Sequence, residues 1–335
     1  MPYDEMDIND NSEGVAAMID NEETSLSLRL RSMCKQHEVT ESFLEQLDVS
    51  EKTRSTYRRA LRQWVTFLYE NQLTIAIANR DTVLAYKKQL KAEGKKPATV
   101  NAYLTAVRRL YAWTEANGDK PNIAASIKGL KKSATTAKDA LTIDQAKALL
   151  ADVPGEEATL EELRNHAIVT LCILRGLRTI EVARADIGDI RTINGQAVLY
   201  VQGKGYSDKS AFVILNQTCL EPINRYLEAR QESDLEAPLF AGTGNRNQGG
   251  RLSTRTVSRI IKAAFAKHGI NSARLTPHST RHTAATMALL AGADLQETRD
   301  MLRHSSINTT MIYAHNIKRM EAGAEHAIDR LLLGA

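Results

Sequence analysis

A short polar and basic stretch, residues 131–138, divides the chain into two blocks whose apolar residues repeat in different ways. The block before it shows only helical spacing, whereas the block after it combines helical segments with a strand-like region. With 335 residues, the chain is long enough for two domains. We therefore predict a flexible acidic tail (1–35), a helical domain (36–130), a linker (131–140) and a second domain (141–335).

Helices account for most of the predicted structure. Apolar residues three and four apart, Pro97 as a helix start and Gly118 as a stop predict helices over 51–68, 81–93 and 97–118 in the first block. Trp64 and Trp113 fall near the apolar stripes, which favours core positions over base-stacking platforms. The second block predicts further helices over 160–174, 218–231, 253–268, 277–290, 295–302, 307–314 and from Ile317 onward.

A small sheet is predicted within the second block. Asn194-Gly195 is a type I′ turn signal inside a hairpin at 189–202, and a strand at 211–215 follows a second turn. The expected fold class is therefore mainly α with a three-stranded antiparallel β-sheet.

Charge is unevenly distributed along the chain. Residues 1–24 hold eight acids and no Lys or Arg, whereas residues 52–138 hold 18 Lys or Arg against five acids. A short charge run is usually a solvated face, but an excess over several helices indicates a surface for a polyanion such as DNA. The candidate DNA contacts are Arg54, Arg58, Arg62, Lys87, Lys88, Lys95, Lys96, Arg108, Lys131 and Lys132.

Several classes of protein are excluded. No run of 18 apolar residues occurs and the N-terminus is acidic, which argues against a membrane span or a secretory signal. Cys34, Cys172 and Cys219 lie too far apart for a zinc knuckle and indicate a reducing, cytoplasmic setting. His278 and His282 are four residues apart but lack a third ligand, so no metal site is expected.

Five short motifs in the second block carry residues of catalytic types. Taken singly, each has an ordinary explanation, such as a surface cap or a lysine in a glycine-rich turn. In chain order their candidate residues are Arg178, Lys204, His278 with Arg281, His304 and Tyr313.

In this order, the motifs resemble the catalytic set of the tyrosine recombinase (integrase) family, which runs Arg, Lys, His-x-x-Arg, His or Trp, and Tyr. The resemblance covers about residues 40–330, because the first block also looks like the family's helical core-binding (SAM-like) domain. It implies a core-binding domain and a mixed α/β catalytic domain that form a C-shaped clamp on DNA. The short N-terminal region favours a layout like Xer or Cre over that of lambda integrase.

The resemblance implies a site-specific recombinase or integrase that cuts and rejoins DNA through a 3′-phosphotyrosyl bond to Tyr313, without metal, ATP or another cofactor. The residue types suit this chemistry, because the guanidinium groups of Arg178 and Arg281 can bind the non-bridging phosphate oxygens. A phenol with an ordinary pKa of about 10 needs nearby cations or a base such as His278. Lys204 is similar to the family lysine that acts as general acid, with Lys209 as its rival.

Two further positions near the motifs leave alternatives open. Glu181, three residues after Arg178, corresponds to an acidic residue that orients the site in the family, or it is a simple surface partner. Arg303 stands where the family usually has Gly. If that backbone needs a positive φ, arginine costs about 1 kcal/mol there, and either the turn is rearranged or Arg303 contacts a phosphate.

Partners and rival functions also follow from the resemblance. It implies double-stranded DNA at specific sites and a homo-oligomer, a dimer on each site and a tetramer in the synapse, joined through the C-terminal helix. Packing of that helix on its own domain stays an alternative, and an accessory recombinase or DNA-bending protein stays possible. The rival functions are a type IB topoisomerase-like relaxase, a catalytically silent sequence-specific DNA-binding protein and a metal nuclease. The target site and the biological role do not follow from the sequence.

Overall fold

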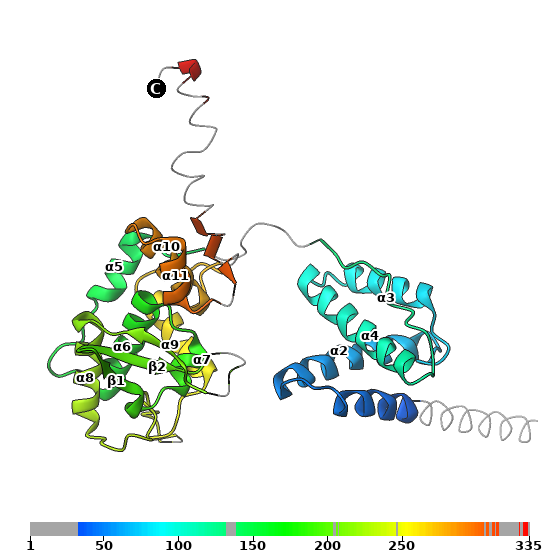
Figure 1. The fold of residues 1–335 in the computed structure, drawn as a ribbon, viewed down its shortest axis with the longest axis horizontal. Coiled ribbons are helices and arrows are strands. Elements are labelled where there is room, and N and C mark those ends of the chain that lie inside the picture. The colour runs from blue at the N-terminus through cyan, green and yellow to red at the C-terminus, as the bar shows by residue number, and fades with distance from the viewer. Residues whose placement is uncertain are drawn as a thin grey trace, which may run out of the picture. The chain divides into compact units, whose positions relative to one another are not determined.

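The computed structural model describes residues 33–131, 139–203, 206, 208–245, 247–304, 306–307, 310–311, 313–314, 328 and 331–333 (Figure 1). The chain divides into two compact units, Met1–Ala134 and Thr135–Ala335. This division falls inside the segment that the sequence predicts as a linker.

The first unit consists of helices around an aromatic core. Residues 33–45 are helical and are followed by α2 (Glu51–Glu70), α3 (Arg80–Ala92) and α4 (Pro97–Ala116). Trp64 on α2 is fully buried, and its ring centroid lies 5.0 Å from that of Tyr86 and 6.3 Å from that of Tyr111. The core position predicted for Trp64 is confirmed, and Trp113 packs partly buried against the same core.

Local signals in the sequence explain where these helices begin. Ser50 and Asn79 cap α2 and α3 by accepting a hydrogen bond from the backbone N–H three residues later. Pro97 occupies the first turn of α4, where its missing N–H costs nothing. The three predicted helices are confirmed, with ends that agree to within two residues.

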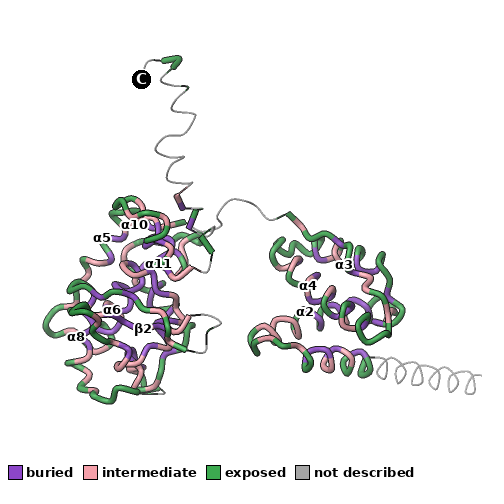
Figure 2. Tube along the Cα trace, viewed as in Figure 1, coloured by how far each residue is buried: buried purple, intermediate pink, exposed green. Residues whose placement is uncertain are grey.

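The second unit packs helices around one buried helix. Its helical elements are α5 (Ile143–Ala151), α6 (Leu160–Arg175), α7 (Thr179–Arg184), the short 3-10 helix η1 (Ile187–Asp189), α8 (Gln217–Arg230), α9 (Thr254–Lys267), α10 (Pro277–Leu290) and α11 (Leu295–Leu302). Helix α6 contacts α5, α8, α9 and α10 and is buried along most of its length (Figure 2). Among the described residues, no helix is long and apolar enough to cross a membrane.

A three-stranded antiparallel sheet completes the second unit. Strands β1 (Ile190–Ile193), β2 (Gln196–Val201) and β3 (Ala211–Ile214) pair in the order β1-β2-β3. Asn194 and Gly195 both have positive φ, as a type I′ turn requires. Leu199 on β2 lies opposite Ile190 and Val213, and its buried side chain faces the core. The predicted fold class, mainly α with a small antiparallel sheet, is confirmed.

Three α-helices among the described residues are not predicted by the sequence. They are residues 33–45, α5 and α7, and the last two are short, which makes their periodicity weak. The predicted helix at 307–314 is helical at each of its described residues. Most of the predicted tail and of the helix from Ile317 lies outside the described residues.

Gly176 makes possible a close approach of three helices. It ends α6 in the left-handed conformation, with φ +59°. A Cβ at this position would lie 2.5 Å from Leu302 Cδ2 and 3.1 Å from Ala284 Cβ. The end of α6 therefore packs tightly against α11 and α10, and this junction lies two residues before Arg178.

We expect Gly176→Ala to lower the free energy of unfolding by about 2–4 kcal/mol, because left-handed strain and a steric clash add together. The matched control is Gly269→Ala in the same unit. Gly269 also has a positive φ, +70°, but an added Cβ would meet nothing within 4 Å, so only the strain of about 1 kcal/mol applies. Urea denaturation measures both variants, and equal losses would contradict the close junction.

Candidate active site

Arg178 begins helix α7, and Glu181 holds it there. The Arg178 backbone N donates to Glu181 Oε2 at 2.8 Å, and Arg178 Nη1 donates to Oε1 at 2.6 Å. The Glu181 side chain is fully buried, whereas that of Arg178 is 27% exposed. Glu181 is therefore not a surface partner, and its position suits the orienting role.

Arg281 joins the ends of two other helices to its own. It lies on α10, is 1% exposed, and donates through Nη1 to the Gly176 carbonyl at 2.7 Å and through Nη2 to the Leu302 carbonyl. Burial, with the positive charges of Arg178 and Arg303, lowers the pKa of Arg281 to about 9. The guanidinium thus stays charged at neutral pH while it fixes α10 against α6 and α11.

Arg303 keeps a left-handed backbone at the end of α11, with φ +56° and ψ +47°. This conformation costs a residue with a Cβ about 1–2 kcal/mol. Arg303 Nη2 donates to Glu181 Oε2 at 2.8 Å, and Nη1 donates to the Met301 carbonyl at 2.5 Å. The turn is therefore not rearranged to avoid a positive φ, and the guanidinium is directed at a buried carboxylate.

His304 lies between Arg281 and Thr310. Arg281 Nε donates to His304 Nε2 at 3.4 Å, and His304 Nδ1 lies 3.0 Å from Thr310 Oγ1. Because a guanidinium only donates, we assign the ring proton to Nδ1, which donates to Thr310. Burial and the positive charges of Arg281 and Arg178 lower the pKa of His304 to about 4, so the ring is neutral at pH 7.

Tyr313 is buried against a pair of histidines. Its side chain is 8% exposed, and its ring meets that of His282 edge-on with the centroids 5.1 Å apart. His282 in turn contacts His278 in the same manner at 4.8 Å. Burial raises the pKa of Tyr313, and the positive charge of Arg281 offsets part of this rise. The sequence analysis weighed His282 only as a metal ligand, although its spacing four residues from His278 was a signal that both share one helix face.

A pocket of about 510 Å³ opens beside Arg178, His278 and Arg281, whereas Tyr313 and His304 are not among its lining residues. Arg178, His278 and Arg281 line it together with Ser258 and Lys262 from α9. Three of these five side chains are cationic, so the pocket suits an anion such as a phosphodiester. The sequence analysis missed Lys262, which lies on a helix without a recognised motif.

Of the two lysines considered as general acid, Lys204 lies outside the described residues. Lys209 Nζ lies 2.5 Å from Asp186 Oδ2 and 2.5 Å from Asp189 Oδ2. These two ion pairs hold the Lys209 ammonium against the carboxylates of Asp186 and Asp189. The structure thus gives Lys209 a structural role next to the β-sheet.

The candidate DNA contacts of the first unit fall into two groups. Arg54, Arg108 and Lys87 donate to backbone carbonyls of the same unit, and Arg58 forms a bidentate ion pair with Glu41 at 3.0–3.1 Å. The exposed candidates are Arg62, Lys88, Lys95, Lys96 and Lys131, and Lys132 lies outside the described residues. The exposed group therefore remains the better candidate for phosphate contacts.

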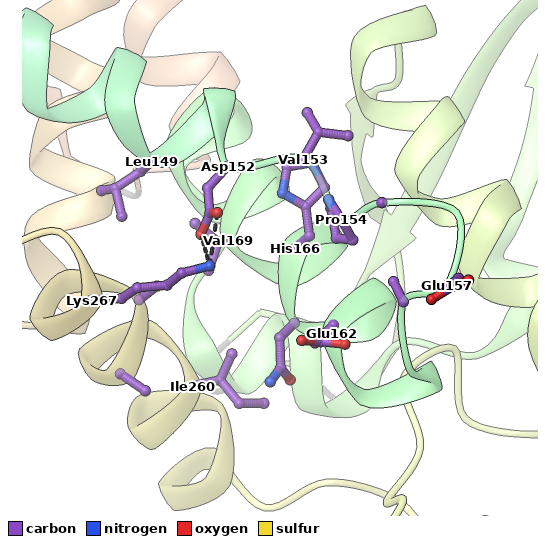
Figure 3. Close-up of a pocket in the computed structure, with 15 residues that line it drawn as sticks. Leu149, Asp152, Val153, Pro154, Glu157, Glu162, His166, Val169, Ile260 and Lys267 are labelled. Carbon is purple, nitrogen blue, oxygen red and sulfur yellow. Dashed lines mark hydrogen bonds and ion pairs between the residues drawn. The ribbon is translucent and has the colours of Figure 1, made fainter.

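A further pocket of the second unit, of about 660 Å³, lies between α5, α6 and α9 (Figure 3). Of the acidic residues that line it, Asp152 is paired with Lys267 at 2.7 Å and with His268 at 3.2 Å. None of the candidate catalytic residues that the structure describes lines it. Within the described ranges, no three His, Cys, Asp or Glu side chains cluster so that they could hold a metal ion.

Known families match both units. Residues 139–320 match the model of the phage integrase family, and residues 40–118 match the N-terminal SAM-like domain of phage integrases. The tyrosine recombinase XerD of Rhizobium meliloti (strain 1021) is 30% identical over 285 residues, which cover 82% of this chain and 89% of that protein. XerC of Pelobacter propionicus is 32% identical over 275 residues, 80% of this chain and 86% of that one.

Solved structures resemble the fold at lower sequence identity. The XerH recombinase bound to a palindromic difH substrate aligns with a TM-score of 0.68 and 20% identity, over 82% of this chain and 79% of that one. A lambda integrase (75–356) dimer bound to a core site aligns with a TM-score of 0.64 and 17% identity, over 83% and 94%. The fold described above is therefore that of DNA recombinases.

We expect the His304 imidazole to titrate near pH 4 in the DNA-free protein, because burial and its arginine neighbours disfavour the charged ring. An unfolded histidine binds a proton below about pH 6.5, whereas folded His304 stays neutral down to about pH 4. The free energy of unfolding should therefore be highest above pH 6.5 and fall as the pH is lowered toward 4. Nuclear magnetic resonance titration, with His304→Gln to assign the signal, measures the value. A pKa at or above 6.5 would contradict the described environment.

Proposed function

The chain belongs to the phage integrase family and is a tyrosine recombinase, and on this premise we propose that it cuts and rejoins DNA strands at specific sites through Tyr313. The observation that carries the proposal is the junction of α6, α10 and α11. It brings Arg178, Arg281 and His304 into one hydrogen-bonded network beside Tyr313. This network provides cations where a phosphodiester gathers negative charge in the transition state.

In the proposed cleavage, the Tyr313 oxygen attacks the phosphorus of the scissile phosphate. A bond forms between phosphorus and the tyrosine oxygen, and the bond to the 5′ oxygen breaks, which leaves a 3′-phosphotyrosyl link. The phenol proton passes to the histidine pair, His282 and His278, and the departing 5′ oxygen takes a proton from Lys204. Attack by the 5′ hydroxyl of another strand reverses these steps, so neither ATP nor a metal ion is required.

The two arginines would do most of the catalytic work. Arg178 and Arg281 both line the 510 Å³ pocket, and each has N–H donors beyond those used within the fold that can bind the non-bridging oxygens. An arginine that contacts a phosphoryl transition state is worth about 10³–10⁵ in rate. Because the DNA-free Tyr313 is buried and has a raised pKa, its hydroxyl stays protonated until a phosphate and the cations activate it.

We further propose that the protein works as an oligomer on double-stranded DNA, in the cytoplasm. Lambda integrase, one of the structural neighbours, has been solved as a dimer on a core site and as a tetramer on a Holliday junction. At the C-terminal end of this chain, Ile328, Leu331 and Leu332 are exposed by 54%, 83% and 73%. These side chains favour a C-terminal helix that binds a neighbouring protomer, and with it a dimer on each site and a tetramer in the synapse.

We also propose that both domains bind the DNA. Residues 36–130 and the basic parts of the catalytic unit would grip the duplex as two arms of a clamp. Binding should then weaken with salt, with a slope of about −0.9 times the number of phosphates neutralised.

We expect Tyr313→Phe to abolish the covalent adduct on a nicked suicide duplex in EDTA while DNA affinity is unchanged, because the variant removes one hydroxyl. Tyr206→Phe is the matched control, since Tyr206 is exposed by 61% and should retain the adduct. Denaturing gels and peptide mass mapping measure the result. An adduct that survives Tyr313→Phe, or that EDTA abolishes, would contradict the proposal.

The same assay separates the rival functions. Specific binding without any adduct would indicate a silent DNA-binding protein. An adduct with relaxation of supercoils by a monomer, but without strand exchange between sites, would indicate a type IB topoisomerase-like relaxase.

We expect the double variant Leu331→Asp, Leu332→Asp to cleave a half-site like the wild type but to lose the tetramer and the recombinant product. A charged side chain would be unfavourable in an apolar contact between protomers. Leu235→Asp is the control, because Leu235 is exposed by 64% in the same unit. Native gels and recombination assays measure both, and full recombination by the double variant would contradict assembly through this segment.

A further inference from the structure

Arg303 occupies a position where the backbone favours glycine, yet its side chain is buried. Its φ is +56°, and the side chain is only 10% exposed. Three other residues with side chains have positive φ among the described residues, and one of them, Gln231, ends α8 in the same conformation. Because glycine adopts this conformation without strain, the contacts of the Arg303 side chain have to explain what stabilises arginine here.

The contacts of Arg303 converge on Arg178. Arg303 Nη2 donates to Glu181 Oε2 at 2.8 Å, while Arg178 Nη1 donates to the other oxygen, Oε1, at 2.6 Å. Arg178 Nη2 also donates to the Arg303 backbone carbonyl at 3.3 Å. One buried carboxylate thus lies between two guanidinium groups, and the turn that carries Arg303 holds the second nitrogen of Arg178.

We infer that Arg303 is a positioning residue, which binds one oxygen of Glu181 and thereby sets the orientation of Arg178 and keeps the surroundings of the scissile phosphate positively charged. The inference rests on the proposed function, because it assigns Arg178 to the phosphate. It adds a residue outside the arginine, lysine, histidine and tyrosine motifs of the catalytic set.

Two physical effects support this role. Oε2 accepts from both Arg303 Nη2 and the Arg178 backbone N, so Arg178 contacts the carboxylate through one side-chain nitrogen and does not form the bidentate pair that would turn its donors away from the pocket. The charge of Arg303 also offsets that of Glu181, so the positive charge of Arg178 is not neutralised by its own orienting carboxylate.

The network also predicts a dependence on pH. Burial raises the pKa of Glu181. The charges and hydrogen bonds of Arg303, and to a smaller extent those of Arg178, lower it, so that the pKa lies below its ordinary value. The other titratable groups that interact with Glu181 are Arg281 on α10 and the thiol of Cys172 on α6. Loss of Arg303 therefore raises the pKa of Glu181, and protonation of the carboxylate would release Arg178 at a higher pH.

The test compares single-turnover cleavage of a suicide half-site by the wild type, Arg303→Gly and Arg303→Lys. Glycine fits the left-handed turn, so Arg303→Gly removes the side chain without new backbone strain. We expect it to cleave about 10- to 100-fold more slowly, the range for a displaced catalytic group, with unchanged DNA affinity. The acidic limb of its rate profile should move to higher pH, and Arg303→Lys should restore part of the rate.

Controls separate positioning from a general effect on the fold. Gln231→Gly also replaces a side chain with glycine at a helix end in the left-handed conformation, and it should leave the cleavage rate unchanged. In a Glu181→Gln background, Arg303→Gly should reduce the cleavage rate by a smaller factor than in the wild type, because both substitutions act through the Glu181 carboxylate.

The outcomes distinguish this inference from the proposed function. If the wild type forms no adduct on the half-site, the proposed function fails. If the wild type forms the adduct and Arg303→Gly matches its rate and pH profile, Arg303 is only a tolerated turn residue and the inference is overturned.

Discussion

A single buried cation, the guanidinium of Arg281, ties together the three chain segments on which the site depends. It is 1% exposed and donates to the carbonyls of Gly176 and Leu302, the ends of α6 and α11. Arg178 follows Gly176 by two residues, and His304 follows Leu302 by two. Because a buried charge is costly unless its hydrogen bonds are made, any displacement of these helix ends leaves Arg281 unsatisfied. The fold and the geometry of the proposed active site are therefore stabilised by the same contacts.

The site carries more positive than negative charge. Arg178, Arg281 and Arg303 surround one carboxylate, Glu181, and the first and third lower the pKa of the second. The repulsion among the three arginines destabilises the DNA-free protein, and a bound phosphodiester would reduce it. The same cations would stabilise the phenolate of Tyr313, which burial alone disfavours. The electrostatics thus provide a cationic site for a phosphodiester close to a tyrosine whose pKa is raised by burial.

Much of this arrangement could be predicted from the sequence, because short signals act locally. The caps at Ser50 and Asn79, the turn at Asn194-Gly195 and the spacing of Arg178 to Glu181 all operate within four residues. What could not be predicted depends on tertiary contacts. The sequence does not show that Arg303 faces Glu181, 122 residues away, or that His282 lies between His278 and Tyr313. Charge counts likewise could not show that Arg58 is engaged by Glu41.

The most direct test of the proposed active site is a crystal structure of the protein trapped on a suicide duplex. We expect phosphorus bonded to the Tyr313 oxygen, with its non-bridging oxygens within hydrogen-bonding distance, about 2.7–2.9 Å, of Arg178 and Arg281. A trapped phosphate that contacts neither guanidinium, or a link to another residue, would contradict it.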